Sequence, residues 1–243
     1  MRLGSLARAS ARATVQDVYE DLHGQIVRGA LRPGDPMSET RVAERYGLSR
    51  TPVREVFWRL REDGFLRVVP QVGTWVAPIN VPAVHDSGFV REALECAAIP
   101  DAARRAAPAD GTRLRGLVAQ QEAALAASDF AAFFAMDEAM HHHLIGMAGR
   151  PFVWQVIAGA KAQLDRVRFL SLSDPDWPGM ILGQHHAIVD RVLAGDGAGA
   201  AAVMQAHLRT AFAAISRIAA QHPEFFEGLG THPDEAPRRL AAS

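Results

Sequence analysis

The stretch RPGDPMSETRVAERYGLSRTPVREVFWRLREDGFLRVVPQVGTWV, residues 32–76, decides the fold of the N-terminal part of the chain. Ser38 is placed to cap a short helix, which Gly47 would end in a left-handed conformation. Ser49 is placed to cap the next helix, and Pro52 falls in its first turn, where a missing N–H does no harm. We therefore predict two helices joined by a tight turn.

One helix precedes this pair and two strands follow it. The preceding helix is predicted from apolar residues on one helical face, at Val15, Val18, Tyr19, Leu22 and Ile26. The last helix of the pair has a similar face, formed by Val53, Val56, Phe57 and Leu60. Two short strands, at 65–69 and 74–77, flank a turn at 70–73. Three helices followed by a hairpin indicate a winged helix-turn-helix.

Two arginines, Arg50 and Arg54, lie near the start of the last helix of this pair. That end of a recognition helix reaches base edges in the major groove, and arginine pairs bidentately with guanine. The alternative is a solvated helix face, in which the arginines pair with Glu55, Glu62 and Asp63. The order of the surrounding elements favours DNA reading.

The overall charge excludes binding of nucleic acid by bulk charge alone, because 26 basic residues face 27 acidic ones and the net charge is −1. Residues 1–77 hold 12 arginines and 9 acidic residues, so the N-terminal part carries a net positive charge. The single cysteine, Cys96, excludes a disulfide framework. No apolar run reaches the ~18 residues of a membrane span, and we expect a cytoplasmic protein without a membrane partner.

The chain divides near two prolines that suit a linker. We predict a disordered arm at 1–14, the winged helix-turn-helix at 15–77, a linker at 78–83, a helical domain at 84–226 and a disordered tail at 227–243. Helices are predicted at 84–106, 112–127, 129–147, 151–171, 179–195 and 198–221. The fold class is therefore mainly α, with a six-helix antiparallel bundle after the winged domain.

Four polar side chains interrupt the apolar faces of these helices. Asp137 and His141 lie one turn apart in the third predicted helix, His185 in the fifth and His207 in the sixth. Three nitrogens and one oxygen suit a divalent metal ion such as Zn²⁺ or Ni²⁺. The alternative is that each histidine is a separately hydrogen-bonded core residue, and the pattern alone leaves both interpretations open.

The segment LSRTPVRE, followed by RLREDGFL, is similar to the DNA-binding signature of the GntR family of bacterial transcription regulators. The resemblance implies that Arg50 and Arg54 contact bases and phosphate of DNA, that Thr51 contacts the DNA backbone and that Gly73 enters the minor groove. Ser49 precedes them as the expected cap. The sequence departs from the pattern at Thr40 and Val72.

The C-terminal half resembles the effector-binding FCD domain of the FadR-type branch of this family, in the runs DEAMHHHLIGMAGRP (137–151), QHHAIVDRVLAGD (184–196) and MQAHL (204–208). The resemblance implies that a metal is held by Asp137, His141, His185 and His207. It also implies a small organic acid as effector, with Arg91 near the cavity. Arg168 flanks the apolar face of the fourth predicted helix and is the second candidate for holding the acid; the alternative for both arginines is an intersubunit or surface ion pair. Departures occur at Met140, Arg150 and Gln184.

We therefore expect a homodimeric, effector-controlled transcription regulator that reads an inverted-repeat operator and acts as a repressor, not as an enzyme. The alternative is a helical metal-dependent hydrolase with an accessory nucleic-acid-binding domain. The pair His85-Asp86 occurs in one such class, but it lies at the start of a helix, away from the other candidate ligands. No nucleophile elbow, P-loop or G-x-G-x-x-G motif is present.

Overall fold

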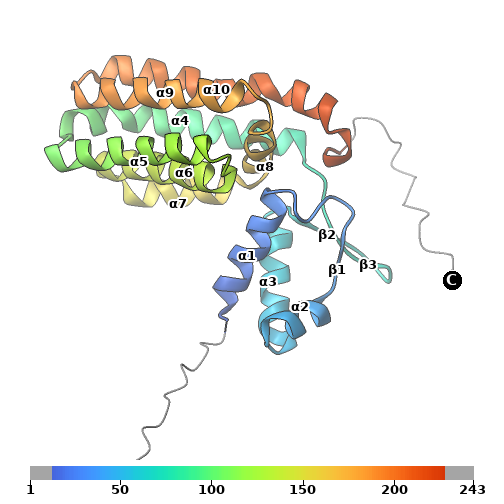
Figure 1. The fold of residues 1–243 in the computed structure, drawn as a ribbon. Coiled ribbons are helices and arrows are strands. Elements are labelled where there is room, and N and C mark those ends of the chain that lie inside the picture. Colours follow the sequence, from blue (N-terminus) through green and yellow to red (C-terminus); the bar gives the residue numbers. More distant parts are fainter. Residues whose placement is uncertain (1–12, 228–243) are drawn as a thin grey trace, which may run out of the picture.

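The computed structural model describes residues 13–227, which form a small N-terminal domain and a larger helical domain (Figure 1). The N-terminal domain contains α1 (Val15–Val27), α2 (Glu39–Tyr46), α3 (Arg50–Glu62), β1 (Pro36–Met37), β2 (Leu66–Val69) and β3 (Gly73–Val76). The strands form one antiparallel sheet in the order β1-β3-β2. The predicted winged helix-turn-helix is confirmed. Strand β1 was not predicted, because two residues are too few to show an alternating pattern.

Local signals start and stop these helices largely as the sequence predicts. The Ser38 side chain accepts a hydrogen bond from the Arg41 amide, and Gly47 ends α2 with a φ of 66°. Thr14 and Asp17 form a capping box at the start of α1. Ser49 occupies the cap position of α3, but its side chain makes no capping bond, so that part of the prediction is wrong.

The helical domain contains seven helices among the described residues, where six were predicted. They are α4 (Val81–Arg105), α5 (Pro108–Ala126), α6 (Phe130–Met147), α7 (Pro151–Ala160), α8 (Ala162–Ser171), α9 (Trp177–Leu193) and α10 (Gly197–Gln221). The helix predicted at 151–171 is broken at Lys161. The buried hydroxyl of Ser87 on α4 donates to the Ala160 carbonyl at 2.6 Å, so a partner from another helix satisfies a group at the break.

The connection between the domains is shorter than predicted. Helix α4 begins at Val81, within the range predicted as a linker, because the Asn80 side chain accepts from the Ala83 amide and caps the helix. Pro82 is tolerated in the first turn. Of the arm and tail predicted to be disordered, residues 1–12 and 228–243 lie outside the described residues.

Two segments hold the domains together. Helix α8 lies over the N-terminal domain (Figure 1), and its Phe169 packs against the hydrophobic cores of both domains. After α10 the short helix η1 (Pro223–Phe225) returns to the connection. The Ile79 amide donates to the Phe225 carbonyl at 2.7 Å, and the Glu227 amide donates to the Ile79 carbonyl at 3.1 Å. We call residues 223–227 the C-terminal strap.

Within the described part of the chain, no helix combines the length and apolar character needed to cross a membrane.

Replacing Phe225 by alanine should destabilise the protein by about 3 kcal/mol, because the ring is buried at the joint beside Gly29 and truncation would leave a cavity. Urea unfolding followed by circular dichroism measures the change. Val72→Ala is the control, since Val72 is 70% exposed and should change stability little. Equal stability of the two variants would show that the strap does not hold the joint.

Candidate DNA-reading face and buried histidine centre

The start of α3 presents the residues predicted to read DNA. Ser49, Arg50, Thr51 and Arg54 are all exposed at this end of the helix. Arg54 Nε lies 3.2 Å from Glu39 Oε2, but the pair is solvated, with 67% and 38% of the two side chains exposed. Such a pair contributes little stability, so Arg54 can exchange this partner for a ligand at small cost.

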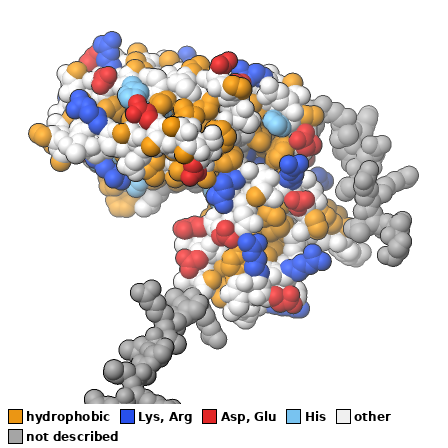
Figure 2. Space-filling model, in the orientation of Figure 1, with side chains coloured by type: hydrophobic (Ala, Val, Ile, Leu, Met, Phe, Trp, Pro, Cys, Tyr) orange, Lys and Arg blue, Asp and Glu red, His pale blue; other side chains and the backbone are white. Residues whose placement is uncertain are grey.

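The arginines farther along α3 behave differently. Arg59 stacks over the Tyr19 ring at 4.0 Å, and Arg61 pairs with Glu62 at 3.0 Å. Arg50 has no ion-pair partner among the described residues. On the face drawn in Figure 2, Lys/Arg and Asp/Glu side chains of this domain are mixed and form no single basic patch. This agrees with the prediction that individually placed arginines read DNA.

Gly73, predicted at the tip of the wing, is exposed at the start of β3 and has a φ of 151°. A Cβ there would lie 3.1 Å from the Trp75 ring, so both the backbone and the neighbouring ring favour glycine. The β2–β3 hairpin that carries Gly73 projects beside α3 (Figure 1).

The four predicted metal ligands meet in the core of the helical domain. Asp137 and His141 come from α6, His185 from α9 and His207 from α10, and all four are buried. One potential ligand atom of each lies within 4.8 Å of the others. His141 Nε2 and His207 Nε2 are 3.2 Å apart, and His185 Nε2 lies 3.1 Å from Asp137 Oδ1.

Each imidazole is held by an acceptor on its outer nitrogen. His141 Nδ1–H donates to Glu95 at 2.5 Å, His185 Nδ1–H to Gln121 at 2.6 Å and His207 Nδ1–H to Gln184 at 3.0 Å. These bonds fix the tautomers, so the three Nε2 lone pairs point inward. Burial lowers the pKa of His185 and, more strongly, that of His207, which keeps both rings neutral near pH 7.

Beside the centre lies a buried ion network. Arg168 contacts Asp137, and its Nη1 donates to Glu138 at 2.6 Å and to Asp165 at 2.8 Å. Lys161 contacts Glu138 and Asp165 from the break between α7 and α8. Burial alone would raise the pKa of Glu138, but Lys161 and Arg168 lower it to about 2. The positive charge of Arg168 is therefore balanced by three carboxylates of the protein itself.

Arg91 is placed differently. Its Nε donates to Glu95 at 2.6 Å, and Glu95 also accepts from His141. Burial would raise the pKa of Glu95, but Arg91 and His141 lower it to about 2. The guanidinium is 2% exposed, and its Nη2 has no hydrogen-bond partner. A buried donor without a partner marks a position where a ligand would be favoured.

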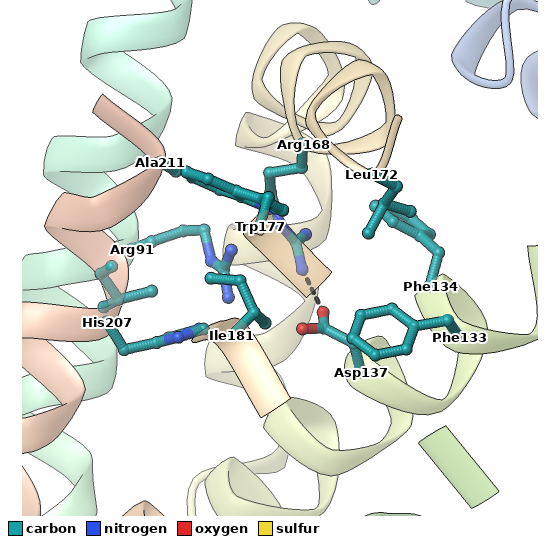
Figure 3. Close-up of a pocket in the computed structure, with 11 residues that line it drawn as sticks. Arg91, Phe133, Phe134, Asp137, Arg168, Leu172, Trp177, Ile181, His207 and Ala211 are labelled. Atoms are coloured by element: carbon teal, nitrogen blue, oxygen red, sulfur yellow. Dashed lines mark hydrogen bonds and ion pairs between the residues drawn. The ribbon is translucent and has the colours of Figure 1, made fainter. Parts of the chain in front are cut away.

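A cavity of about 410 Å³, counted with its open mouth, adjoins the centre (Figure 3). Its polar lining consists of Arg91, Asp137, Arg168 and His207, and the dashed contact in Figure 3 joins Arg168 to Asp137. Both arginines predicted to bind the effector thus lie on one cavity with two of the predicted metal ligands.

Comparison with known proteins accounts for both domains. The model for bacterial regulatory proteins of the gntR family matches residues 14–76, and the model for the FCD domain matches residues 87–210. The chain belongs to the GntR family.

Full-length relatives agree with this assignment. The regulator is 36% identical over 222 residues to an uncharacterized HTH-type transcriptional regulator in an unstable DNA locus of Streptomyces ambofaciens, covering 91% of this chain and 93% of that one. It is 32% identical over 211 residues to the HTH-type transcriptional repressor RspR of Escherichia coli strain K12, covering 87% and 92%.

Solved structures share the fold. Escherichia coli McbR/YncC superposes with a TM-score of 0.73 at 20% identity, covering 86% of this chain and 99% of that one. A putative GntR transcriptional regulator from Rhodococcus sp. RHA1 superposes with a TM-score of 0.70 at 22% identity, covering 85% and 97%.

The protein is a DNA-binding transcription regulator, and its family and relatives are not enzymes. The hydrolase alternative is therefore wrong. His85 and Asp86, which raised it, are exposed on α4 and take no part in the buried centre.

The sequence analysis did not predict two of the acceptors that orient the histidines, Glu95 and Gln121. Glu95 lies four residues after Arg91, on the buried face of α4, and Gln121 lies on the buried face of α5. The interruption of an apolar face that identified the histidines would also have found Glu95 and Gln121. The pairing of Arg168 with Asp137 has no such signal, because it joins α8 to α6 across the fold.

Arg168→Met should lower the free energy of unfolding by about 3 kcal/mol or more, because it removes the arginine partner of buried Asp137 and leaves Glu138 and buried Asp165 with Lys161 as their remaining cation. Urea unfolding of chelator-treated protein measures the loss. In the control, Arg191→Met removes an arginine that is 57% exposed, and stability should change little. If both variants unfold at the same urea concentration, the network is not a stabilising element.

Proposed function

We propose that the regulator is a homodimeric repressor of an inverted-repeat operator, and that a small organic acid bound at a divalent metal ion in the helical domain controls it. The observation that carries this proposal is the inward convergence of three imidazole Nε2 atoms and one carboxylate in an apolar core. This observation supports the proposed control by an effector. DNA binding itself already follows from the family assignment.

A shared cation explains the centre better than separate core histidines do. Since both Nδ1 atoms donate outward, the Nε2 lone pairs of His141 and His207 face each other at 3.2 Å. His185 Nε2 is buried and makes no hydrogen bond. A divalent ion held by these atoms and Asp137 would satisfy all of them, and Zn²⁺ or Ni²⁺ fits the donor set. When bound, the ion would supply a Lewis acid for a carboxylate oxygen.

An acid fits the remaining polarity of the cavity. The unpartnered Nη2 of Arg91 supplies a buried positive donor on the cavity wall. Charge-assisted hydrogen bonds from arginine to carboxylate are among the strong ones in proteins. Arg168 holds Asp137 instead, so its proposed contribution is to position a metal ligand beside the acid.

Helix α8 supports a route from the centre to the DNA reader. Arg168 on this helix contacts Asp137, while Gln163, one and a half turns earlier, donates to the Gly64 carbonyl at 2.9 Å. Gly64 lies two residues after the end of α3, and the Asn80 amide in the connection donates to Gln163 as well. A ligand that shifts α8 would therefore shift the reader, which is the differential contact that allosteric control requires.

The proposed dimer contact lies on α4 and α7, which pack together. Phe89 is 74% exposed, Phe152 is 76% exposed and Val156 is 58% exposed on these helices. Large exposed apolar side chains of this kind favour a partner surface, and we assign it to a second copy of the chain. A two-fold dimer matches an inverted repeat. The similarity to RspR of Escherichia coli, a transcriptional repressor, supports repression here.

Selection from a random duplex pool should enrich an inverted repeat, because each α3 reads one half-site. Arg50→Ala with Arg54→Ala should abolish the enrichment and leave only weak binding that falls steeply with salt. Sequencing of the bound fraction at two salt concentrations measures both outcomes.

A matched variant separates reading from dimerisation. Selection with Phe152→Asp should still enrich the half-site sequence but not its inverted repeat. Light scattering should report that this variant is a monomer. Equal enrichment by wild type and the double-arginine variant would contradict the assignment of the reading face, and a repeat retained by a monomer would contradict the dimer.

Asp137→Ala combined with His185→Ala should abolish stoichiometric metal, because two of four ligands from two helices are removed. Mass spectrometry of metal content after dialysis against a trace-metal-free buffer measures it. His186→Ala is the control, since His186 is exposed and pairs with Glu122 outside the centre. Full metal content in the double variant would refute the proposed metal site.

A further inference from the structure

The cavity beside the histidine centre combines polar and apolar side chains. Figure 3 shows Arg91 and His207 on one side and Phe133, Phe134 and Leu172 on the other, with Arg168 and Asp137 between them. We propose that the effector is a monocarboxylic acid with a compact apolar or aromatic body, and not a hydroxylated acid or a polycarboxylic acid. This inference rests on the proposed function, because it takes an acid effector at this cavity as given.

The apolar walls set the character of the effector body. Three of the lining side chains are aromatic, Phe133, Phe134 and Trp177, and they are joined by Leu172, Ile181 and Leu208. Arg168 lies over the Phe134 ring at 4.9 Å, so an intramolecular cation occupies that ring. Arg217 also lies over the Trp177 ring, at 5.9 Å, so Phe133 and the other face of Trp177 are the surfaces against which a flat apolar group can pack.

The polar side chains of the cavity can pair with one carboxylate of a ligand. Asp137 and His207 belong to the proposed metal set, and Arg168 is neutralised by Asp137, Glu138 and Asp165. Arg91 alone among the cavity-lining arginines has a buried nitrogen without a partner. A second carboxylate on the ligand would be buried without a free cation to pair with, which is unfavourable.

Apart from Arg91, Asp137, Arg168, His207 and the indole N–H of Trp177, the residues of the lining offer no side-chain partners for hydroxyl groups. Among the described residues that line the cavity there is no serine, threonine, tyrosine, asparagine or glutamine. A hydroxyl group carried into such walls loses water and gains no hydrogen bond. Pockets with apolar walls discriminate against an added hydroxyl by about a hundredfold. A sugar acid carries several hydroxyl groups and should bind more weakly than a hydrocarbon acid of the same length.

The size of the cavity limits the effector to a small molecule. The space of about 410 Å³ includes open solvent at the mouth, so the enclosed part is smaller than this. A compact ligand suits such a space better than a long acyl chain does.

The experiment titrates zinc-loaded, full-length regulator with phenylacetate, phenylacetamide, succinate and gluconate. Calorimetry gives affinities, and tryptophan fluorescence reports contact with Trp177, with Trp177→Phe to subtract the other tryptophans. Zinc content is measured after each titration, so that loss of metal to a ligand is recognised. Phenylacetate should bind about a hundredfold more tightly than gluconate and should change Trp177 fluorescence, whereas the uncharged amide should bind weakly.

Two variants probe the polar and the apolar part of the lining. Arg91→Gln should weaken phenylacetate binding at least tenfold without changing the preference for apolar bodies. Ala211→Ser places a hydroxyl on the apolar wall at a helical position that tolerates it, and it should narrow the gap between phenylacetate and gluconate. The second variant keeps the test valid if Arg91→Gln fails to fold.

The outcomes separate this inference from the proposed function. Equal or tighter binding of succinate or gluconate would overturn the inference and leave an acid effector in place. Failure of every acid to bind zinc-loaded protein would overturn both. Tight phenylacetate binding with an unchanged affinity for the selected operator would support the inference and overturn the proposed control of DNA binding.

Discussion

Four polar side chains buried in an apolar helical core constrain this molecule more than any other feature. The inner nitrogens of the three imidazoles have no proton to donate, since the outer nitrogens of the rings already donate to Glu95, Gln121 and Gln184. Burial of such acceptors away from water without a donor is costly. The proposed shared cation would resolve this conflict, and the packing of α6, α9 and α10 brings its candidate ligands together.

Under the proposed function, the same constraint would give the regulator a means of control. The carboxylate of the centre contacts Arg168 on α8, and α8 contacts the end of the recognition helix through Gln163. Helix α10 carries His207 and leads into the C-terminal strap, which pairs with the connection at Ile79. Two helices that hold the centre therefore also touch the joint between the domains, while Arg50 and Arg54 remain exposed for DNA.

Helical periodicity and capping signals made much of this predictable. Asp137, His141, His185 and His207 could be found because each interrupts an apolar face, and such a face must point inward. The break at Lys161, the strand β1 and the pairing of Arg168 with Asp137 depend on contacts between distant segments, which leave no local pattern. The start of α4 at Val81 was not predicted, because prolines in this segment suggest a linker. The first turn of a helix nevertheless accepts proline.

The central claim is that one divalent cation is shared by the three histidines and Asp137. X-ray absorption spectroscopy of the zinc-loaded regulator tests it most directly, because the method reports the atoms bound to the metal. The account predicts nitrogen and oxygen neighbours at ~2.0–2.1 Å with the outer-shell scattering of imidazole rings, reduced when His207 is replaced by alanine. A shell of oxygen atoms alone, without imidazole scattering, would contradict it.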